Sequence, residues 1–439
     1  MSTPALDTIV APATPLATSA LAIVRIDGPL AHSIIKGLGA PKDLAERRAV
    51  FVRLETAEGP LDEVIVISYV APKSFTGNDL IEITCHGSPL IVGTLVKEVI
   101  DRGARMAEPG EFTERAVLNG KLDLVQAEAI GDLINSRTTL QAQLSLSNLG
   151  GTLSRWAGEI RADLLFLIAR LEGALDFADE GYTFITDEEA MRHLDEDLAR
   201  IRSLAETARR GRGLRDGLTA VILGRPNAGK STLLNHLCGS ERAIVTPTPG
   251  TTRDLIRETV IVGGLPVTFI DTAGLRTGGE LVEEIGQFRA LEAASKADLV
   301  IWLEDSSDPD LTDVPSEARD AILVFSKVDQ KAAPPEGLGI SARTGAGMTV
   351  LWERLDREVR DRFRPPEGSP LIVNARQERE INEAGDALRQ ARLGVSEGLS
   401  EEMILVDLYA ASSAIGRLTG AISSSEIQNE IFSNFCIGK

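Results

Sequence analysis

The sequence predicts a multidomain protein of the α+β and α/β classes, in which an α/β segment is inserted into a helical region. Three observations predict it. A chain of 439 residues is longer than one hydrophobic core usually organises. Short β-branched runs dominate residues 1–119, and apolar residues at helical spacing then dominate 120–216 and 365–439. Between those helical stretches, strand-like and helix-like segments alternate over 217–364.

The N-terminal region, residues 1–119, is expected to form an α+β domain. Its strand-like runs are ALAIVRIDG at 20–28, EVIVISYV at 63–70 and LIEITCHG at 80–87, each bounded by Gly, Pro, Asp or Asn. One helical segment, HSIIKGL, lies between the first two runs. We therefore expect a β-rich domain in this region.

Residues 120–216 and 365–439 are expected to form one discontinuous, all-helical domain. The basic run ARRGRGLRDG at 208–217 is either a nucleic-acid patch or the end of a helix, and we interpret it as a helix end and a domain boundary, because cations favour a helix C-terminus and glycine ends one. The apolar positions at helical spacing are Val125, Ala129, Leu133, Ile134, Leu149, Leu153, Trp156, Ile160, Leu164, Leu167, Leu171, Leu175, Leu194, Leu198, Ile201, Ala205, Ile381, Ala384, Leu388, Ala391, Leu405, Leu408, Ala411, Ile415 and Leu418.

The inserted segment, 217–364, is expected to be a parallel α/β sheet. Strands are predicted at LTAVILG, VTFID, ADLVIWLED and AILVFSKVD, and helices after Lys230, around 283–295 and at LWERLDREV. Alternation of this kind places the ends of successive strands at one edge of the sheet, where ligands usually bind.

Charge and cysteine content exclude several classes of protein. A net charge of −19 argues against a broad basic face that coats nucleic acid. Three cysteines and four histidines show no zinc or disulfide spacing, and we expect Cys85 and Cys238 to be buried apolar residues. Because no apolar run approaches about 18 residues and the N-terminus has no basic region, we expect a cytoplasmic protein with no membrane partner.

A phosphate-binding loop is the strongest motif. GRPNAGKS at 224–231 follows a predicted strand and precedes an apolar helix, as the G-x-x-x-x-G-K-S pattern requires. Its glycines turn backbone N–H groups toward phosphate oxygens, Lys230 reaches the β and γ phosphates, and Ser231 offers a hydroxyl to Mg²⁺. The nucleotide-binding residues expected here are Asn227, Ala228, Gly229, Lys230, Ser231 and Thr232.

Four further motifs follow in order and predict a guanine-nucleotide hydrolase. TTRD supplies Thr252 to Mg²⁺, DTAG meets the γ-phosphate, the Asp329 carboxylate of SKVD accepts hydrogen bonds from guanine, and SAR meets guanine O6. The nucleotide-binding residues expected from these motifs and from the loop before TTRD are Thr246, Thr251, Thr252, Asp271, Thr272, Ala273, Gly274, Lys327, Asp329, Ser341 and Ala342.

Two positions depart from the usual motifs. Ser326 stands where the base-reading motif usually has Asn, so we expect the amide contacts to the base and to the phosphate loop to be lost and affinity to be micromolar. Leu275 stands where Ras-like enzymes place a water-orienting Gln. A monovalent cation held near Asn227 by the loop AIVTPTPGTTRD would stand where an arginine finger usually does.

These motifs, together with DTIVAPATP at 7–15, PGEFTERAVLNGKLDLVQAEAIGDLI at 109–134, DTAGLR at 271–276 and the terminal FCIGK, resemble the MnmE (TrmE) family of tRNA-modification GTPases. The resemblance covers nearly the whole chain. It implies an N-terminal tetrahydrofolate-binding domain that dimerises, a discontinuous helical domain ending in CIGK, and an inserted Ras-like GTPase domain.

The resemblance also implies site residues. Asn227, Thr246, Thr248 and Thr251 would surround K⁺. Glu283 would orient the attacking water, and a different register of the match would place Glu280 or Glu284 in that role instead. Arg25, Glu82, Lys121 and Lys439 would bind a folate, since a carboxylate can pair with pterin donors and cations suit its glutamate tail.

The family further implies partners and cofactors. A homodimer would join a flavin-dependent partner, MnmG (GidA), in a heterotetramer that adds a carboxymethylaminomethyl or aminomethyl group to carbon 5 of the wobble uridine of tRNA, U34. The one-carbon unit would come from a tetrahydrofolate derivative (5,10-methylene- or 5-formyl-tetrahydrofolate). GTP, Mg²⁺ and K⁺ would bind this chain, and FAD and NADH the partner.

Two alternatives to a modification enzyme stay open at this point. The first is a nucleotide-switched assembly protein, but the folate positions and the CIGK ending favour a modification enzyme. The second is a folate enzyme in which the GTPase domain is regulatory and Cys436 is the nucleophile, although only Lys439 is visible as a basic neighbour. The Gly and Lys that follow Cys436 argue against its prenylation.

Overall fold

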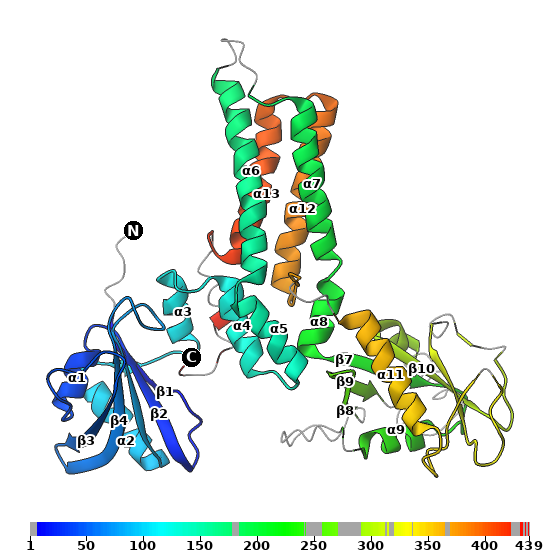
Figure 1. The fold of residues 1–439 in the computed structure, drawn as a ribbon, viewed down its shortest axis with the longest axis horizontal. Helices are drawn as coiled ribbons and strands as arrows, with labels where there is room; N and C mark the ends of the chain where they lie inside the picture. Colours follow the sequence, from blue (N-terminus) through cyan, green and yellow to red (C-terminus); the bar gives the residue numbers. More distant parts are fainter. Residues whose placement is uncertain are drawn as a thin grey trace. The chain divides into compact units, whose positions relative to one another are not determined.

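The computed structural model describes residues 7–177, 184–240, 242, 257–270, 291–311, 314–315, 320–335, 337–364, 369–422, 431–432, 435 and 438. The chain separates into two compact units. The first consists of 1–131, 149–161 and 412–439, and the second of 132–148 and 162–411. Both sheets and the long helices are visible in Figure 1, and the predicted mixture of α+β, helical and α/β parts is confirmed. The boundaries at 119, 216 and 364 stay a prediction.

The first unit contains a six-stranded sheet in the order β3-β4-β5-β2-β1-β6. Its neighbours are antiparallel except for β1 and β6. The helices α1 and α2 supply Ile35, Leu95 and Val99 to a core with the buried face of the strands. The elements are β1 (Ile9–Pro12), β2 (Ser19–Asp27), α1 (Ala31–Gly37), β3 (Ala49–Thr56), β4 (Gly59–Tyr69), β5 (Leu80–Gly87), α2 (Pro89–Asp101) and β6 (Arg105–Met106).

Helices complete the first unit. α3 (Glu111–Leu118) and α4 (Leu124–Ile134) follow the sheet along the chain. Leu124 and Ala127 of α4 form a small buried cluster with Phe432, so residues more than 300 apart in sequence lie side by side. This contact brings the C-terminal segment back to the N-terminal part of the unit.

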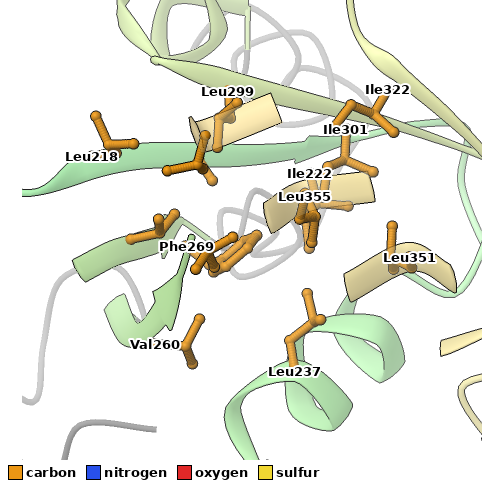
Figure 2. Packing of buried hydrophobic residues seen from close by; sticks show 14 of the residues in the cluster. Leu218, Ile222, Leu237, Val260, Phe269, Leu299, Ile301, Ile322, Leu351 and Leu355 are labelled. Atoms are coloured by element: carbon orange, nitrogen blue, oxygen red, sulfur yellow. The ribbon is translucent and has the colours of Figure 1, made fainter. Parts of the chain in front are cut away.

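The second unit contains the predicted α/β sheet, in the order β12-β11-β10-β7-β9-β8. All pairs are parallel except β8 with β9. Figure 2 shows its core, where Ile222 and Phe269 of the strands pack with Leu237 and Leu355 of the helices. The elements are β7 (Leu218–Leu223), α9 (Lys230–Cys238), β8 (Arg257–Val262), β9 (Leu265–Ile270), β10 (Leu299–Asp305), β11 (Ile322–Ser326), β12 (Leu338–Gly339) and α11 (Met348–Phe363).

Long helices carry the predicted apolar stripes. Ile381, Leu388 and Leu408 are buried, whereas Ile134, also predicted to face inward, is 47% exposed at the end of α4. α7 begins with a capping box formed by Thr186 and Glu189. The helices are α5 (Thr139–Leu149), α6 (Thr152–Asp176), α7 (Asp187–Ala205), α8 (Ala208–Asp216), α12 (Ala375–Glu397) and α13 (Glu401–Thr419).

The basic run 208–217 corrects one expectation. It does not end the preceding helix but forms a helix of its own, α8, with two glycines inside it. A Cβ on Gly211 would lie 1.6 Å from the Ile372 carbonyl oxygen, so this glycine permits close packing, and Gly217, with a φ of 90°, follows the helix. Among the residues that the structure describes, none of the helices is long and apolar enough to cross a membrane.

Candidate functional site

The phosphate loop joins β7 to α9 at the carboxyl edge of the second sheet. Gly224 has a φ of 145°, and a Cβ there would lie 2.0 Å from the Leu303 carbonyl oxygen. Asn227 and Gly229 also have positive φ, at 64° and 94°. These conformations let the loop pass tightly over β10 and enter the N-terminus of α9, whose first N–H groups can meet an anion.

Lys230 lies over its own loop. Its Nζ donates to the carbonyl oxygens of Gly224 and Arg225, each at 2.8 Å. Phosphate oxygens entering the loop would compete for this cation as the preferred acceptors. The lysine is therefore positioned where the motif predicts a contact with phosphate.

A pocket of about 230 Å³ lies beside the loop and collects residues from three separate motifs. Its lining includes Gly229 and Thr232 from the loop and α9, Lys327 and Asp329 after β11, and Ser341 and Ala342 after β12. The parallel sheet brings them together because its strand ends meet at one edge. Six predicted nucleotide-binding residues thus line one cavity.

Asp329 lies in this pocket as a carboxylate. A hydrogen bond with Ser341 and the charge of Arg343 lower its pKa, and the Arg343 Nη2 lies 3.1 Å from its Oδ2. An ionised carboxylate can accept the two adjacent N–H groups of a guanine edge. In this structure Arg343 pairs with the Asp329 carboxylate, so a bound base would have to share that carboxylate with Arg343.

Lys327 is fixed by a second carboxylate. Its Nζ donates to Asp305 Oδ2 at 2.6 Å, and its backbone has a φ of 58°. Burial raises the pKa of Asp305, but hydrogen bonds from Lys327 and Ser307 outweigh it and lower the pKa to about 2. The ion pair holds the aliphatic stem of Lys327 along the pocket.

Ser326 corrects part of an expectation. Its hydroxyl lies 2.7 Å from the Ala228 carbonyl oxygen and 3.1 Å from that of Glu304, and the residue is 6% exposed. The link between the end of β11 and the phosphate loop is therefore kept, through a hydroxyl instead of an amide. The expected loss of base contacts is a separate matter and stays a prediction.

In the first unit the register of the sheet brings two predicted residues into contact. Arg25 of β2 lies opposite Glu82 of β5, and its Nε donates to Glu82 Oε1 at 2.8 Å. The hydroxyl of Tyr69 donates to the other carboxylate oxygen at 3.3 Å, and Arg25 Nη1 donates to the Gly438 carbonyl oxygen at 3.4 Å. Burial and the neighbouring Glu82 raise the pKa of Tyr69. The C-terminal segment thus contacts this ion pair.

The segment 72–79 forms another side of the Arg25 site. The Phe75 ring centroid lies 5.8 Å from the Arg25 guanidinium carbon, within reach of a cation–π contact. Lys121 Nζ donates to the Pro72 carbonyl oxygen at 3.1 Å. No sequence pattern pointed to Tyr69 or Phe75, because single aromatic residues on a strand or a loop usually only pack.

A buried network holds the same segment. Asp27 is fully buried and accepts hydrogen bonds from Thr76, from Asn78 Nδ2 at 3.0 Å and from Arg115 Nη1 at 3.0 Å. Asn119 Nδ2 donates to Asn78 Oδ1 at 3.0 Å and to the Thr76 carbonyl oxygen at 2.7 Å. Because buried polar groups need such partners, the network fixes the segment that carries Phe75.

The cysteine expectations have mixed outcomes. Cys85 is 1% exposed, as expected, and burial raises its pKa to about 11. Cys238 is only partly buried and packs against the core of the second unit. The predicted residues that lie outside the described part of the chain are Thr246, Thr248, Thr251, Thr252, Asp271, Thr272, Ala273, Gly274, Glu283, Cys436 and Lys439.

Comparison with known proteins decides the family. Residues 8–121 match the family described as the GTP-binding protein TrmE N-terminus, and residues 124–436 match the MnmE helical domain. The chain is 40% identical to the tRNA modification GTPase MnmE of Chlorobium chlorochromatii, over 98% of each chain. The chain belongs to the MnmE (TrmE) family of tRNA modification GTPases.

Other MnmE proteins agree. The chain is 40% identical to MnmE of Koribacter versatilis over 99% of each chain, and 38% identical to MnmE of Aquifex aeolicus over 98% of this chain and 99% of the relative. The G domain of the Thermotoga maritima FeoB iron transporter shares 22% identity over 32% of this chain and 98% of its own, with a TM-score of 0.23. A likeness that low carries no weight beside the MnmE matches.

Proposed function

We propose that the chain hydrolyses GTP and acts in tRNA modification, the activity for which its relatives are named. The observation that carries the nucleotide assignment is the pocket in which residues of the phosphate loop, of SKVD and of SAR meet. Asn227, Ala228, Gly229, Lys230, Ser231 and Thr232 bind the phosphates, and Lys327, Asp329, Ser341 and Ala342 bind the base.

Replacing Lys230 tests this assignment. Lys230→Ala removes the cation that reaches the β and γ phosphates, and GTP turnover should fall by more than about 100-fold. Phosphate release is measured on the full-length protein, and circular dichroism checks that the variant is folded. Unaltered turnover would contradict the assignment.

Metal ions belong to the same proposal. The Ser231 hydroxyl, at the first turn of α9, would hold Mg²⁺ together with Thr252. Asn227 is exposed and has a positive φ, and its side chain carries an amide oxygen, which fits a ligand of K⁺ with Thr246, Thr248 and Thr251. Such cations neutralise charge on the phosphates. Asp271, Thr272, Ala273 and Gly274 would meet the γ-phosphate, and Glu283 would orient the attacking water.

The first unit would bind the tetrahydrofolate derivative. The pairing of Arg25 with Glu82, and the donation from Arg25 to Gly438, support a site built from both ends of the chain. Glu82 would accept from the pterin, while Lys121 and Lys439 would pair with carboxylates of the tail. Cys436 precedes Lys439 by three residues and would serve either packing or chemistry there.

The partner completes the proposed reaction. A homodimer would combine with a flavin-dependent MnmG (GidA) into a heterotetramer that carries FAD and NADH and modifies carbon 5 of U34. A chain with a net charge of −19 suits this arrangement, because the partner would supply the basic surface for tRNA. A cytoplasmic location follows from this substrate.

A further inference from the structure

Glu304 is a buried carboxylate on a largely apolar strand. It is 1% exposed near the end of β10, where Val300 and Trp302 share its face of the sheet. A central parallel strand normally carries apolar residues, since burying a charge is costly unless it is paired and hydrogen-bonded. Because Glu304 lies at the carboxyl edge of the sheet, beside the phosphate loop, its buried carboxylate is placed to act on that loop.

The contacts of Glu304 lead to the phosphate loop. Its Oε2 accepts from Trp302 Nε1 at 3.1 Å, and its Oε1 accepts from the Asp310 N–H at 3.4 Å. The same Oε1 lies 3.9 Å from Nη1 of Arg225, the second residue of the loop. Asp310 Oδ2 lies 3.9 Å from that nitrogen as well, so the Arg225 cation is drawn toward β10 by two carboxylates.

Two backbone ties strengthen the same connection. Gly224 lies against the Leu303 carbonyl, and the Ser326 hydroxyl lies 2.7 Å from the Ala228 carbonyl oxygen and 3.1 Å from that of Glu304. The loop is therefore held at its start, at its second residue and at its fifth. Because Lys230 Nζ is bonded to the carbonyl oxygens of Gly224 and Arg225, a shift of Arg225 also shifts the lysine.

We propose that Glu304 is a positioning residue for GTP, which holds the phosphate loop in its binding shape through Arg225 and joins it to the base-reading end of β11 through Ser326. This inference rests on the proposed nucleotide site. A preformed loop loses less conformational freedom when the nucleotide binds, so the gain appears as affinity and slow release. A purely structural Glu304, serving only the Trp302 indole, would affect stability and leave affinity alone.

The pair Glu304 and Arg225 can be tested by a double-mutant cycle. Glu304→Gln keeps an oxygen that accepts from Trp302 but loses the charge facing Arg225, and Arg225→Gln removes the other partner. Each variant should release a fluorescent GDP analogue about tenfold faster, with a raised KM for GTP and a kcat within about twofold of wild type. The double variant should be no worse than either single one, because both remove one interaction.

Trp302 supplies a spectroscopic readout. In a Trp156→Phe, Trp352→Phe background, nucleotide binding should change the Trp302 emission, and Glu304→Gln should reduce that change. Glu380→Gln is the matched control, since Glu380 is also 1% exposed and pairs with Arg379 at 3.2 Å on α12, away from the sheet. It should release GDP at the wild-type rate.

Three outcomes distinguish a failure of the proposed Glu304 role from a failure of the proposed nucleotide site. Wild-type GDP release in both Glu304→Gln and Arg225→Gln, or fully additive effects, would overturn the positioning role. If Glu304→Gln does not fold, Arg225→Gln still decides, because Arg225 is 47% exposed and its loss leaves the core intact. Normal turnover in Lys230→Ala would instead overturn the nucleotide site itself.

Discussion

Ser326 retains, through its hydroxyl, the link to the phosphate loop that an asparagine would make through its amide. The substitution shortens the side chain, yet the Ala228 carbonyl oxygen still has a partner at 2.7 Å. The amide contacts to the base are still expected to be lost, because Ser326 has no amide group. A sequence motif therefore predicts which residues surround the nucleotide, but the partner of a substituted side chain depends on distances that only the folded strand end sets.

Removing this hydroxyl should weaken nucleotide binding. Ser326→Ala leaves the buried Ala228 carbonyl without that partner, and the Kd for GDP should rise about five- to tenfold. Ser306→Ala is the control, because Ser306 is also buried, next to β10, and its hydroxyl donates to the Lys331 carbonyl oxygen at 2.7 Å. Titration with a fluorescent nucleotide measures both, and equal affinities for Ser326→Ala and Ser306→Ala would contradict the role.

Among whole elements, the sequence predicted the long amphipathic helices well and the short elements poorly. β1 and β3 were missed, because alternation over a few residues hardly distinguishes a strand from a loop. β8 was missed because it pairs with β9 through a turn at Gly263 and Gly264, and the conformation of that turn decides whether the hairpin forms. α8 was misread as a helix end. Its glycines serve packing against another segment, and that neighbour is not visible in the local sequence.

Two helical glycines, replaced by alanine, distinguish the effect of close packing from the effect of helix propensity on stability. Alanine is the better helix former at either position, by about 1 kcal/mol. At Gly211 of α8 the new Cβ would meet the Ile372 carbonyl, so Gly211→Ala should lower the free energy of unfolding by about 1–3 kcal/mol. At Gly158 of α6 nothing lies within 4 Å, so Gly158→Ala should raise it slightly. Thermal unfolding of both variants checks the opposite signs, and a stabilised Gly211→Ala would refute the packing argument.

Helix α7 contains a carboxyl group that should make stability depend on pH. Asp197 is 2% exposed, its Oδ2 has no hydrogen-bond partner among the described residues, and Arg200 Nη1 lies 3.6 Å from its Oδ1. Burial, and then the charge of Asp163, raise the pKa of Asp197 to about 7, which Arg200 only partly offsets. Since the folded state keeps the proton that the unfolded state loses near pH 4, stability should fall as the pH rises from about 4 to 7.

Asp197→Asn removes this dependence. The variant should gain stability over wild type as the pH rises from 5 to 8, on the order of 2 kcal/mol, because its amide carries no charge to bury. Chemical denaturation at pH 5 and pH 8 measures the difference. Arg192→Gln, in an exposed pair with Glu196, serves as the control and should change little at either pH. A constant difference between Asp197→Asn and wild type would show that Asp197 does not titrate in this range.

At the scale of the whole molecule, the sequence predicted a nucleotide site whose parts lie up to 118 residues apart, from Gly224 to Ala342, because strand ends in a parallel sheet meet at one edge. It assigned Arg25 and Glu82 to one site only by resemblance, and it did not predict that they pair, since alternation along a strand does not identify the neighbouring strand or the register. The contact of Arg25 with Gly438 is further beyond local patterns, as 413 residues separate the two. Assembly of several chains is indicated by a different feature, namely apolar side chains that are exposed in the single chain.

The first sheet exposes such side chains at β3 and β4. α1 and α2 pack on one side with Val52, Val64 and Val66, while on the other side the cross-strand neighbours Phe51 and Ile65 are 64% and 37% exposed. Exposed apolar pairs on a sheet often mark a protein interface. This face supports the proposed homodimer, whose two copies would bury it against each other.

Charges on that face should therefore dissociate the dimer. We expect Phe51→Glu with Ile65→Glu to convert a dimer to a monomer in light scattering, because each new carboxylate would be desolvated in the interface. Leu90→Glu is the matched control, since Leu90 is 77% exposed on α2, which covers the opposite face, and it should leave the mass unchanged. A dimer that survives both glutamates would place the interface elsewhere. A monomeric variant that still binds GDP with wild-type affinity would show that each chain carries a complete nucleotide pocket, and would leave hydrolysis as the step that needs the second copy.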